Sequence, residues 1–377
     1  MNTAAASVAA VDYAPALRLL LGAALVALLP LAWVWLRQRD TPRRLAALTA
    51  LTLFLTFDLV VFGAFTRLTD SGLGCPDWPG CYGEASPLGA REQIHAAQAA
   101  LPDGPVTWHK AWIEMIHRYL AATVGALILV LAAVSWRERQ RLPHTPWWPT
   151  LTLAWVIVQG LFGRWTVTLK LYPAIVTLHL LGGLALLVLL AFQHAAYGRQ
   201  PLALPAVLRR GALMAMAVLA VQVALGGWVS TNYAVLACEG FPLCNGQAWP
   251  TMDFGHGFTL RRELGLAGHG GALPFEALVA IQMAHRLFAV IASAVLAWLA
   301  WALWRRGGAG RFGAGLGALL LLQWASGLSN VVLGWPLVAA LGHSAGAAAM
   351  ALLLALLIAR AGVAPAPARP QPLPVAA

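Results

Sequence analysis

Charged residues are scarce in this chain, and this scarcity excludes an ordinary soluble protein. Of the 377 residues, 10% are charged and 60% are hydrophobic. A soluble domain of this composition would have too few polar side chains to cover its apolar surface. The net charge of +11 arises from 25 Lys and Arg against 14 Asp and Glu. The composition therefore predicts a membrane protein.

Three further features are missing, and each absence removes a class of protein or site. No Cys-x-x-Cys motif is present, which argues against a zinc ribbon or a thioredoxin-like redox site. No carboxylate-rich set accompanies the histidines of the apolar segments, which argues against a metal ion held by protein ligands alone. The start, 1–15, has no basic n-region and is not rich in arginine. We therefore expect neither a cleaved signal peptide nor a mitochondrial transit sequence.

Long apolar runs dominate the rest of the chain. A helix needs roughly 20 apolar residues to cross a bilayer. Nine runs reach this length, at 16–36, 48–67, 112–135, 147–168, 173–194, 211–230, 278–303, 312–334 and 336–360. The sequence thus predicts an all-α polytopic membrane protein.

The basic residues lie in alternate loops, so they indicate orientation and not binding to nucleic acid. They follow the first, third, fifth and seventh spans: Arg37, Arg39, Arg43, Arg44; Arg137, Arg139, Arg141; Arg199, Arg209, Arg210; Arg305, Arg306, Arg311. The positive-inside rule places these loops in the cytoplasm. We therefore expect a bacterial inner-membrane protein with a periplasmic N-terminus and a disordered, cytoplasmic Pro/Ala-rich tail at 361–377.

An internal repeat divides the chain into two halves. Cys75 and Cys81 recur 163 residues later, His117 recurs 168 residues later, and His179 recurs 164 residues later. Repeats of this kind report architecture directly. We predict two pseudo-symmetric four-helix bundles, related by an axis along the membrane normal, and one extra N-terminal helix. The predicted units are 1–47, 48–210 with outer loop 68–111, 211–360 with outer loop 231–277, and the tail 361–377.

Four histidines lie inside the apolar spans, two in each half. His117, His179, His285 and His343 are five to seven residues from the outer ends of their spans, which is roughly 8–11 Å deep. A single histidine at this depth could simply bond to a neighbouring helix. Four at one depth are typical of axial haem ligands in a helical bundle.

Arginines near the outer ends of the spans are candidate partners for haem propionates, because a guanidinium binds carboxylates well. Arg118 and Arg286 each follow a histidine, and Arg67 and Arg164 are weaker candidates. The alternative is an arginine whose charge reaches the membrane interface.

The cysteines form two pairs in the outer loops, where a disulfide is permitted. Cys75 and Cys81 enclose five residues, as do Cys238 and Cys244, and this spacing suits a small looped disulfide. We interpret the second pair as a structural staple. For the first pair, a redox or mechanistic role stays open beside the structural one.

One acidic residue distinguishes the halves. Glu114 lies three residues before His117, whereas its counterpart before His285 is Gln282. A carboxylate beside a haem ligand can transfer protons and an amide cannot. The first half is therefore the predicted reaction centre, unless Glu114 is merely an interfacial residue.

Four segments resemble the haem A synthase family: GAFTRLTDSGLGCPDWPGC (63–81), EMIHR (114–118), LACEGFPLCNG (236–246) and QMAHR (282–286). The resemblance covers roughly residues 48–360. It implies an eight-helix enzyme that oxidises a ring methyl of haem O to a formyl group, making haem A for cytochrome oxidase. The extra span 16–36 departs from that pattern.

The resemblance also implies roles for individual residues. His285 and His343 correspond to the ligands of a bound haem b, and His117 and His179 to the ligands proposed for the substrate, haem O. Glu114 corresponds to the acidic residue that takes part in the oxidation. The cysteine pairs correspond to the family's loop cysteines.

The expected partners are the haem O substrate, membrane lipid, a haem O synthase, an electron acceptor and a second copy of the chain. Nucleic acid is not expected. Three alternatives remain open: a haem b electron carrier that oxidises or reduces quinol, a quinone-linked disulfide generator, and a transporter built from parallel repeats.

Overall fold

A computed structural model describes residues 14–362 except 39, 143, 199–200 and 307. The described residues form α-helices joined by loops, with isolated β-bridges and no strands. The predicted features of 1–13, the loop residues Arg39 and Arg199, and residues 363–377 of the predicted tail lie outside the described residues. The first two residues of that tail continue the last helix.

The described part of the chain contains nine long α-helices, two short α-helices and two 3₁₀-helices, at Arg139–Arg141 and Ala234–Leu236. The long helices are α1 (Ala14–Arg37), α2 (Thr41–Leu68), α4 (Trp108–Arg137), α5 (Trp147–Thr168), α6 (Pro173–Gly198), α7 (Ala206–Thr231), α9 (Phe275–Trp304), α10 (Gly310–Val332) and α11 (Leu337–Gly362). The short ones are α3 (Arg91–Ala100) and α8 (Phe254–Gly257).

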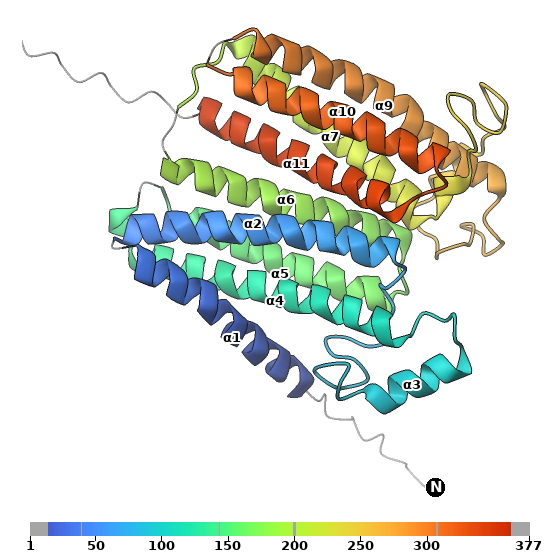
Figure 1. Ribbon diagram of the computed structural model, residues 1–377, viewed down its shortest axis with the longest axis horizontal. Helices are drawn as coiled ribbons and strands as arrows, with labels where there is room; N and C mark the ends of the chain where they lie inside the picture. Colours follow the sequence, from blue (N-terminus) through green and yellow to red (C-terminus); the bar gives the residue numbers. More distant parts are fainter. Residues whose placement is uncertain (1–13, 39, 143, 199–200, 307, 363–377) are drawn as a thin grey trace, which may run out of the picture.

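Eight of these helices, all the long ones except α5, are both long and apolar enough to cross a membrane. The span predicted at 147–168 is helical over those residues. Its composition is less apolar, because α5 carries four threonines together with Gln159 and Arg164. Figure 1 shows α5 lying alongside α4 and α6. The all-α, multi-pass membrane fold is therefore confirmed with eight candidate spans, and the crossing of α5 stays a prediction.

Local capping explains where α2 begins. The side chain of Asp40 accepts a hydrogen bond of 2.9 Å from the N–H of Arg43, and a proline follows at the start of the helix. Both are strong signals for a helix N-terminus. The helix thus begins at Thr41, and the predicted unit boundary at 47/48 falls inside α2. The boundary at 210/211 likewise falls inside α7.

The long helices pack as two neighbouring sets of four, with α1 at the edge (Figure 1). The first set is α2, α4, α5 and α6, and the second is α7, α9, α10 and α11. Helices α6 and α2 of the first set contact α11 of the second, and α6 also contacts α7. Their relation by pseudo-symmetry stays a prediction.

Helix α1 packs against α4 and α2 through one narrow stripe. Leu19, Ala23, Ala27 and Val34 are buried in that stripe, whereas most of its other large side chains are exposed apolar residues. This pattern fits a peripheral helix that faces lipid on most of its circumference.

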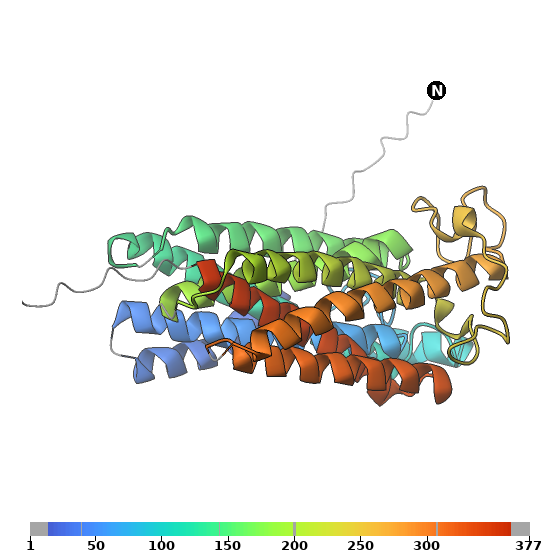
Figure 2. The same ribbon diagram turned by 90° about the horizontal axis from the view of Figure 1, so that it is seen from above.

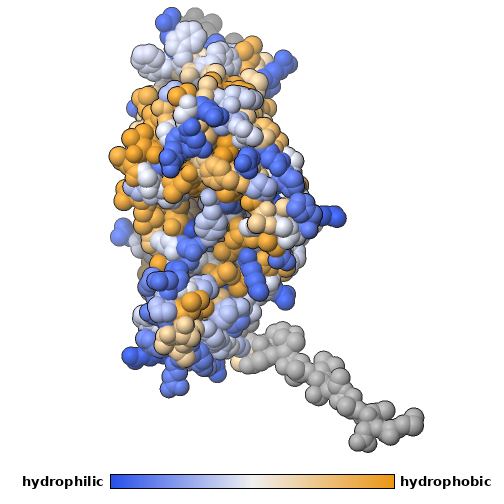
Figure 3. All heavy atoms as spheres, turned by 90° about the vertical axis from the view of Figure 1, so that its right-hand side faces the viewer, coloured by the Kyte–Doolittle hydropathy of each residue, from blue (hydrophilic) through white to orange (hydrophobic). Residues whose placement is uncertain are grey.

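The long loops gather at one end of the helices. Figures 1 and 2 show the segment after α2 and the segment after α7 at this same end. Seen end-on, this surface mixes hydrophilic and hydrophobic residues (Figure 3). Both cysteine-containing loops thus lie over the same ends of the two helix sets.

Two glycines of α10, one turn apart, provide a matched test of helix packing. A Cβ atom at Gly313 would lie 2.4 Å from the backbone nitrogen of Trp304, whereas one at Gly317 would meet nothing within 4 Å. Gly313→Ala should therefore separate α10 from α9 and lower stability by about 1–3 kcal/mol. Gly317→Ala should be neutral or stabilising by up to about 1 kcal/mol. Thermal unfolding in detergent checks this, and equal midpoints for the two variants would contradict it.

Candidate active site

A cavity of about 1110 Å³ lies between the two helix sets and is lined by residues from every long helix. This is at or above the upper end of the range of roughly 300–1,000 Å³ for small-molecule sites. Its walls are mostly apolar, and a small number of polar groups face it. The predicted site residues that line it are His117, His179, His285, His343, Glu114, Arg67, Arg118 and Arg286.

Each cavity histidine packs against a glycine of the helix that precedes it in the chain. A Cβ atom on these glycines would approach Cε1 of the imidazole to 3.0 Å (Gly63 and His117), 3.6 Å (Gly163 and His179), 2.9 Å (Gly226 and His285) and 3.2 Å (Gly327 and His343). The same arrangement therefore occurs four times, in α2, α5, α7 and α10. A side chain at Gly63, Gly226 or Gly327 would crowd the imidazole, whereas a Cβ atom at Gly163 would make an ordinary van der Waals contact.

The structure brings the histidines together in the predicted pairs. His117 lies nine residues after the start of α4, and His285 lies ten residues after the start of α9. His179 and His343 each lie six residues after the start of their helices. His117 and His179 thus extend from two helices of the first set, and His285 and His343 from two helices of the second, into the same cavity.

The two histidines of the second half have side-chain partners on Nδ1. Gln222 Nε2 lies 3.1 Å from Nδ1 of His285, and Ser326 Oγ lies 3.0 Å from Nδ1 of His343. Ser326 Oγ also donates to the carbonyl of Leu322 at 2.7 Å. The serine therefore accepts a hydrogen bond from Nδ1–H of His343. That tautomer leaves Nε2 with its lone pair free, as a metal ligand requires.

The two histidines of the first half have no such partners. Nδ1 of His117 and Nδ1 of His179 are buried without a hydrogen bond. The repeat offsets place Leu59 where the second half has Gln222, and Phe162 where it has Ser326. Sequence reasoning missed these polar partners, although alignment of the two halves by the same offsets would have found them.

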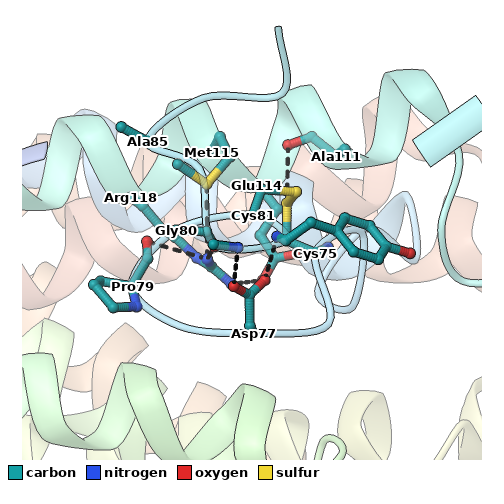
Figure 4. Close-up of a disulfide and its surroundings, with 12 residues drawn as sticks. Cys75, Asp77, Pro79, Gly80, Cys81, Ala85, Ala111, Glu114, Met115 and Arg118 are labelled. Atoms are coloured by element: carbon teal, nitrogen blue, oxygen red, sulfur yellow. Dashed lines mark hydrogen bonds and ion pairs between the residues drawn. A yellow bond between two sulfur atoms is a disulfide. The ribbon is translucent and has the colours of Figure 1, made fainter. Parts of the chain in front are cut away.

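Glu114 is tied to the first disulfide loop (Figure 4). Its Oε2 accepts a hydrogen bond of 2.7 Å from the backbone N–H of Cys75, and its Oε1 pairs with Nη2 of Arg118 at 2.5 Å. Arg118 also donates to the carbonyl of Gly80. Glu114 is 4% exposed, so this carboxylate is buried; it lines the cavity and anchors the loop.

The second half anchors its loop without a carboxylate. Arg286 donates to the carbonyls of Cys238 at 2.9 Å, Gly240 at 3.0 Å and Leu243 at 3.3 Å. Gln282 occupies the position of Glu114. Nε of Arg286 is buried without a partner, and this unpaired donor lies in a residue that lines the cavity.

Both predicted cysteine pairs are disulfide-bonded. Cys75 is joined to Cys81, Cys238 is joined to Cys244, and all four residues are buried. The first disulfide belongs to the same cluster as Glu114, through the N–H of Cys75 (Figure 4).

The two weaker arginine candidates differ in position. Arg67 lines the cavity, donates to the carbonyl of Ser230 at 2.5 Å and lies 4.1 Å from the ring centroid of Tyr233. The Tyr233 hydroxyl donates to Asp70, and burial raises the pKa of Tyr233. Arg164 is exposed and lies outside the cavity lining.

No group of three or more His, Cys, Asp or Glu within the described ranges could hold a metal ion. A smaller cluster lies in the second outer loop, where His256 contacts Asp253 at 2.5 Å and His269 at 3.2 Å. Hydrogen bonds from the backbone and imidazole of His256 lower the pKa of Asp253.

The fold and the site define a class: helical, multi-pass membrane proteins with two pairs of histidines lining one cavity. Residues 46–357 match the cytochrome oxidase assembly protein family COX15-CtaA. The haem A synthase of Shewanella oneidensis is 38% identical over 310 residues, covering 81% of this chain and 93% of the relative. The haem A synthase of Caulobacter vibrioides is 30% identical over 338 residues, covering 82% and 94%. The chain belongs to the haem A synthase family, and the whole of α1 precedes residue 46, where the family match begins.

The two loop-anchoring arginines provide the next test. Arg118→Gln would leave the buried carboxylate of Glu114 without its cation, a change that costs about 3–5 kcal/mol. Arg286→Gln leaves no buried charge unpaired, because the residue in the position of Glu114 is Gln282. This substitution should lower the free energy of unfolding by about 1–3 kcal/mol. Thermal unfolding and protease resistance of the outer loops measure the difference.

The double variant Arg118→Gln/Glu114→Gln is the control for this comparison. Removal of both charges should recover most of the stability that Arg118→Gln loses. Equal losses in the two single variants, or no recovery in the double variant, would contradict the role of the buried ion pair.

Proposed function

We propose that this chain is a haem A synthase, which oxidises a ring methyl of haem O to the formyl group of haem A. The observation that carries the proposal is one cavity lined by two histidine pairs whose surroundings differ. The match to haem A synthases over more than nine-tenths of two relatives' lengths supports the same reaction.

The second half, 211–360, is proposed to bind a resident haem b through His285 and His343. Gln222 and Ser326 contact these Nδ1 atoms and so orient both rings, which suits a permanently bound group. Ser326 also fixes the tautomer of His343 that ligation through Nε2 requires. The glycines facing both rings leave room beside the imidazoles. When bound, haem b supplies a redox centre that accepts and passes on electrons.

The first half, 48–210, is proposed to bind the substrate haem O through His117 and His179. Their Nδ1 atoms have no partners, so these rings are less constrained, which suits a ligand that must enter and leave. Glu114 lies one turn from His117 and lines the same cavity. We assign it the proton transfers that accompany oxidation of the methyl group.

Three arginines of the cavity lining are proposed to attract the propionates. The buried, unpaired Nε of Arg286 supports this for the second half. Arg118 and Arg67 already pair with Glu114 and Ser230, so a propionate would share them with these partners. The exposed Arg164 has no such support from its position.

The proposed orientation places the basic loops in the bacterial cytoplasm and both disulfides outside, with the N-terminus periplasmic. An oxidising exterior is consistent with two structural disulfides. The proposed partners are a haem O synthase as the source of substrate, an electron acceptor, and a second copy of the chain. A haem b electron carrier is less well supported, because it would not need Glu114 opposite Gln282.

Co-expression with a haem O synthase in cells that lack haem A tests the reaction. Extracted haems, separated by chromatography and identified by mass, should include haem A only when this chain is present. Haem b alone with unconverted haem O would favour the electron carrier, and a purified protein free of haem would favour the disulfide generator or the transporter.

Substitutions separate the two halves. His285→Ala or His343→Ala should remove the resident haem spectrum from the purified protein. Glu114→Gln should keep that spectrum and lower haem A output by about 10²-fold or more, the usual contribution of a positioned acid or base. Gln282→Ala is the matched control and should keep most of the output. Full output from Glu114→Gln would reject its role.

A further inference from the structure

The seam between α9 and α10 is closed by aromatic side chains. Trp324 of α10 donates from Nε1 to Oγ of Ser293 on α9 at 3.0 Å. The ring of Phe241, from the disulfide loop, packs edge-on against Trp324 with centroids 6.3 Å apart. All three residues line the cavity. These three side chains therefore fill the space between α9 and α10 on one side of the second half.

The equivalent seam of the first half, between α4 and α5, lacks this filling. The repeat offsets of 164 and 168 place Gly160 opposite Trp324 and Gly125 opposite Ser293. A Cβ atom at either glycine would meet nothing within 4 Å, and both glycines line the cavity. Trp78 corresponds to Phe241, and Gly160, which corresponds to Trp324, supplies no indole for it to pack on.

The opening leads from the candidate substrate site to the lipid-facing surface. His117, Ala121 and Gly125 lie at i, i+4 and i+8 and so share one face of α4. All three line the cavity, and Gly160 across the seam is exposed. Helices α4 and α5 also pack less closely than α9 and α10. The first half thus has an opening between α4 and α5 at Gly125 and Gly160, here called the slot. The second half has Trp324 and Phe241 at the equivalent place, here called the plug.

We propose that Gly125 and Gly160 form the entrance for the long apolar tail of haem O, and that Trp324 excludes such a tail from the second half. This inference rests on the proposed function. Haem O and haem b differ by that tail, so a site that admits it needs an apolar path out of the bundle. An indole across the path rejects the tail by steric overlap and retains a haem without one.

The slot also explains how two similar helix sets could each bind a different haem, without either set taking the other's haem. The ligating histidines and their facing glycines are alike in both halves, so they cannot discriminate between the haems. The halves differ in the space between two helices: it is open between α4 and α5 and filled between α9 and α10. Selection by the seam leaves the iron ligands unchanged.

The first experiment transplants the plug into the first half. Gly160→Trp should lower haem A output at least tenfold in cells that supply haem O, while the resident haem b spectrum of the purified protein is unchanged. Gly317→Trp is the matched control: this helical glycine also has open space around it, lies outside the cavity lining, and should keep full output.

The second experiment removes the plug from the second half. In a His117→Ala background, which leaves His285 and His343 as the complete pair, the purified protein should retain haem b. Adding Trp324→Gly should raise the ratio of bound haem O to haem b at least tenfold when both haems are present. The haems are extracted and quantified by chromatography.

The outcomes of these experiments distinguish a failure of the proposed slot from a failure of the proposed haem A synthase activity. Failure of the unaltered chain to make haem A rejects the proposed function, and the haem ratio in the second experiment still measures tail exclusion. Normal haem A output from Gly160→Trp overturns the slot. If Gly160→Trp loses the resident haem, misfolding explains its inactivity, and an unchanged haem ratio after Trp324→Gly then overturns the inference.

Discussion

The site depends on the packing of four imidazoles against four glycines inside an apolar cavity. A histidine in the hydrocarbon region of a bilayer is costly unless it faces a cavity or a partner. Here each imidazole lies over a glycine of the preceding helix, within 2.9–3.6 Å of the position that a Cβ atom would take. Because glycine has no side chain, the two helices can approach closely while the imidazole stays between them at the cavity wall.

On this common frame, the two halves differ in their polar partners. Gln222 and Ser326 contact the histidines of the second half, whereas Leu59 and Phe162 take their places in the first. The only carboxylate in the cavity lining, within the described residues, is Glu114 of the first half. These differences are the basis for proposing that the second half holds a fixed group and the first a ligand that exchanges and reacts.

The outer loops are coupled to the histidine helices by arginines. Arg118 and Arg286 each follow a cavity histidine and donate to carbonyls of a disulfide loop. Because each arginine and its histidine belong to the same helix, displacement of a loop would be transmitted to the ligand position. This coupling gives the disulfides a structural role at the site in addition to closing their own loops.

Much of the architecture was predictable from sequence, because apolar length and the internal repeat are local or periodic signals. The membrane helices, the four histidines and the two cysteine pairs follow from such signals. The start predicted for α2, residue 48, was less accurate, because the helix begins at Thr41. The cap and first turns of a helix are polar and so fall outside an apolar run. Gln159 and Arg164 lie in α5, the one predicted span that is not among the eight candidate membrane helices of the described residues.

Amino-acid order alone specifies which residues recur in the two halves and where they stand along their apolar spans. Only the tertiary structure decided that Glu114 is paired with Arg118, that both loop arginines bind carbonyls, and that glycines face every cavity histidine. It also distinguished the plugged seam at Trp324 from the open one at Gly160. The reason is physical: hydrogen bonds and open space depend on how side chains from separate helices meet, which spacing along one chain does not specify.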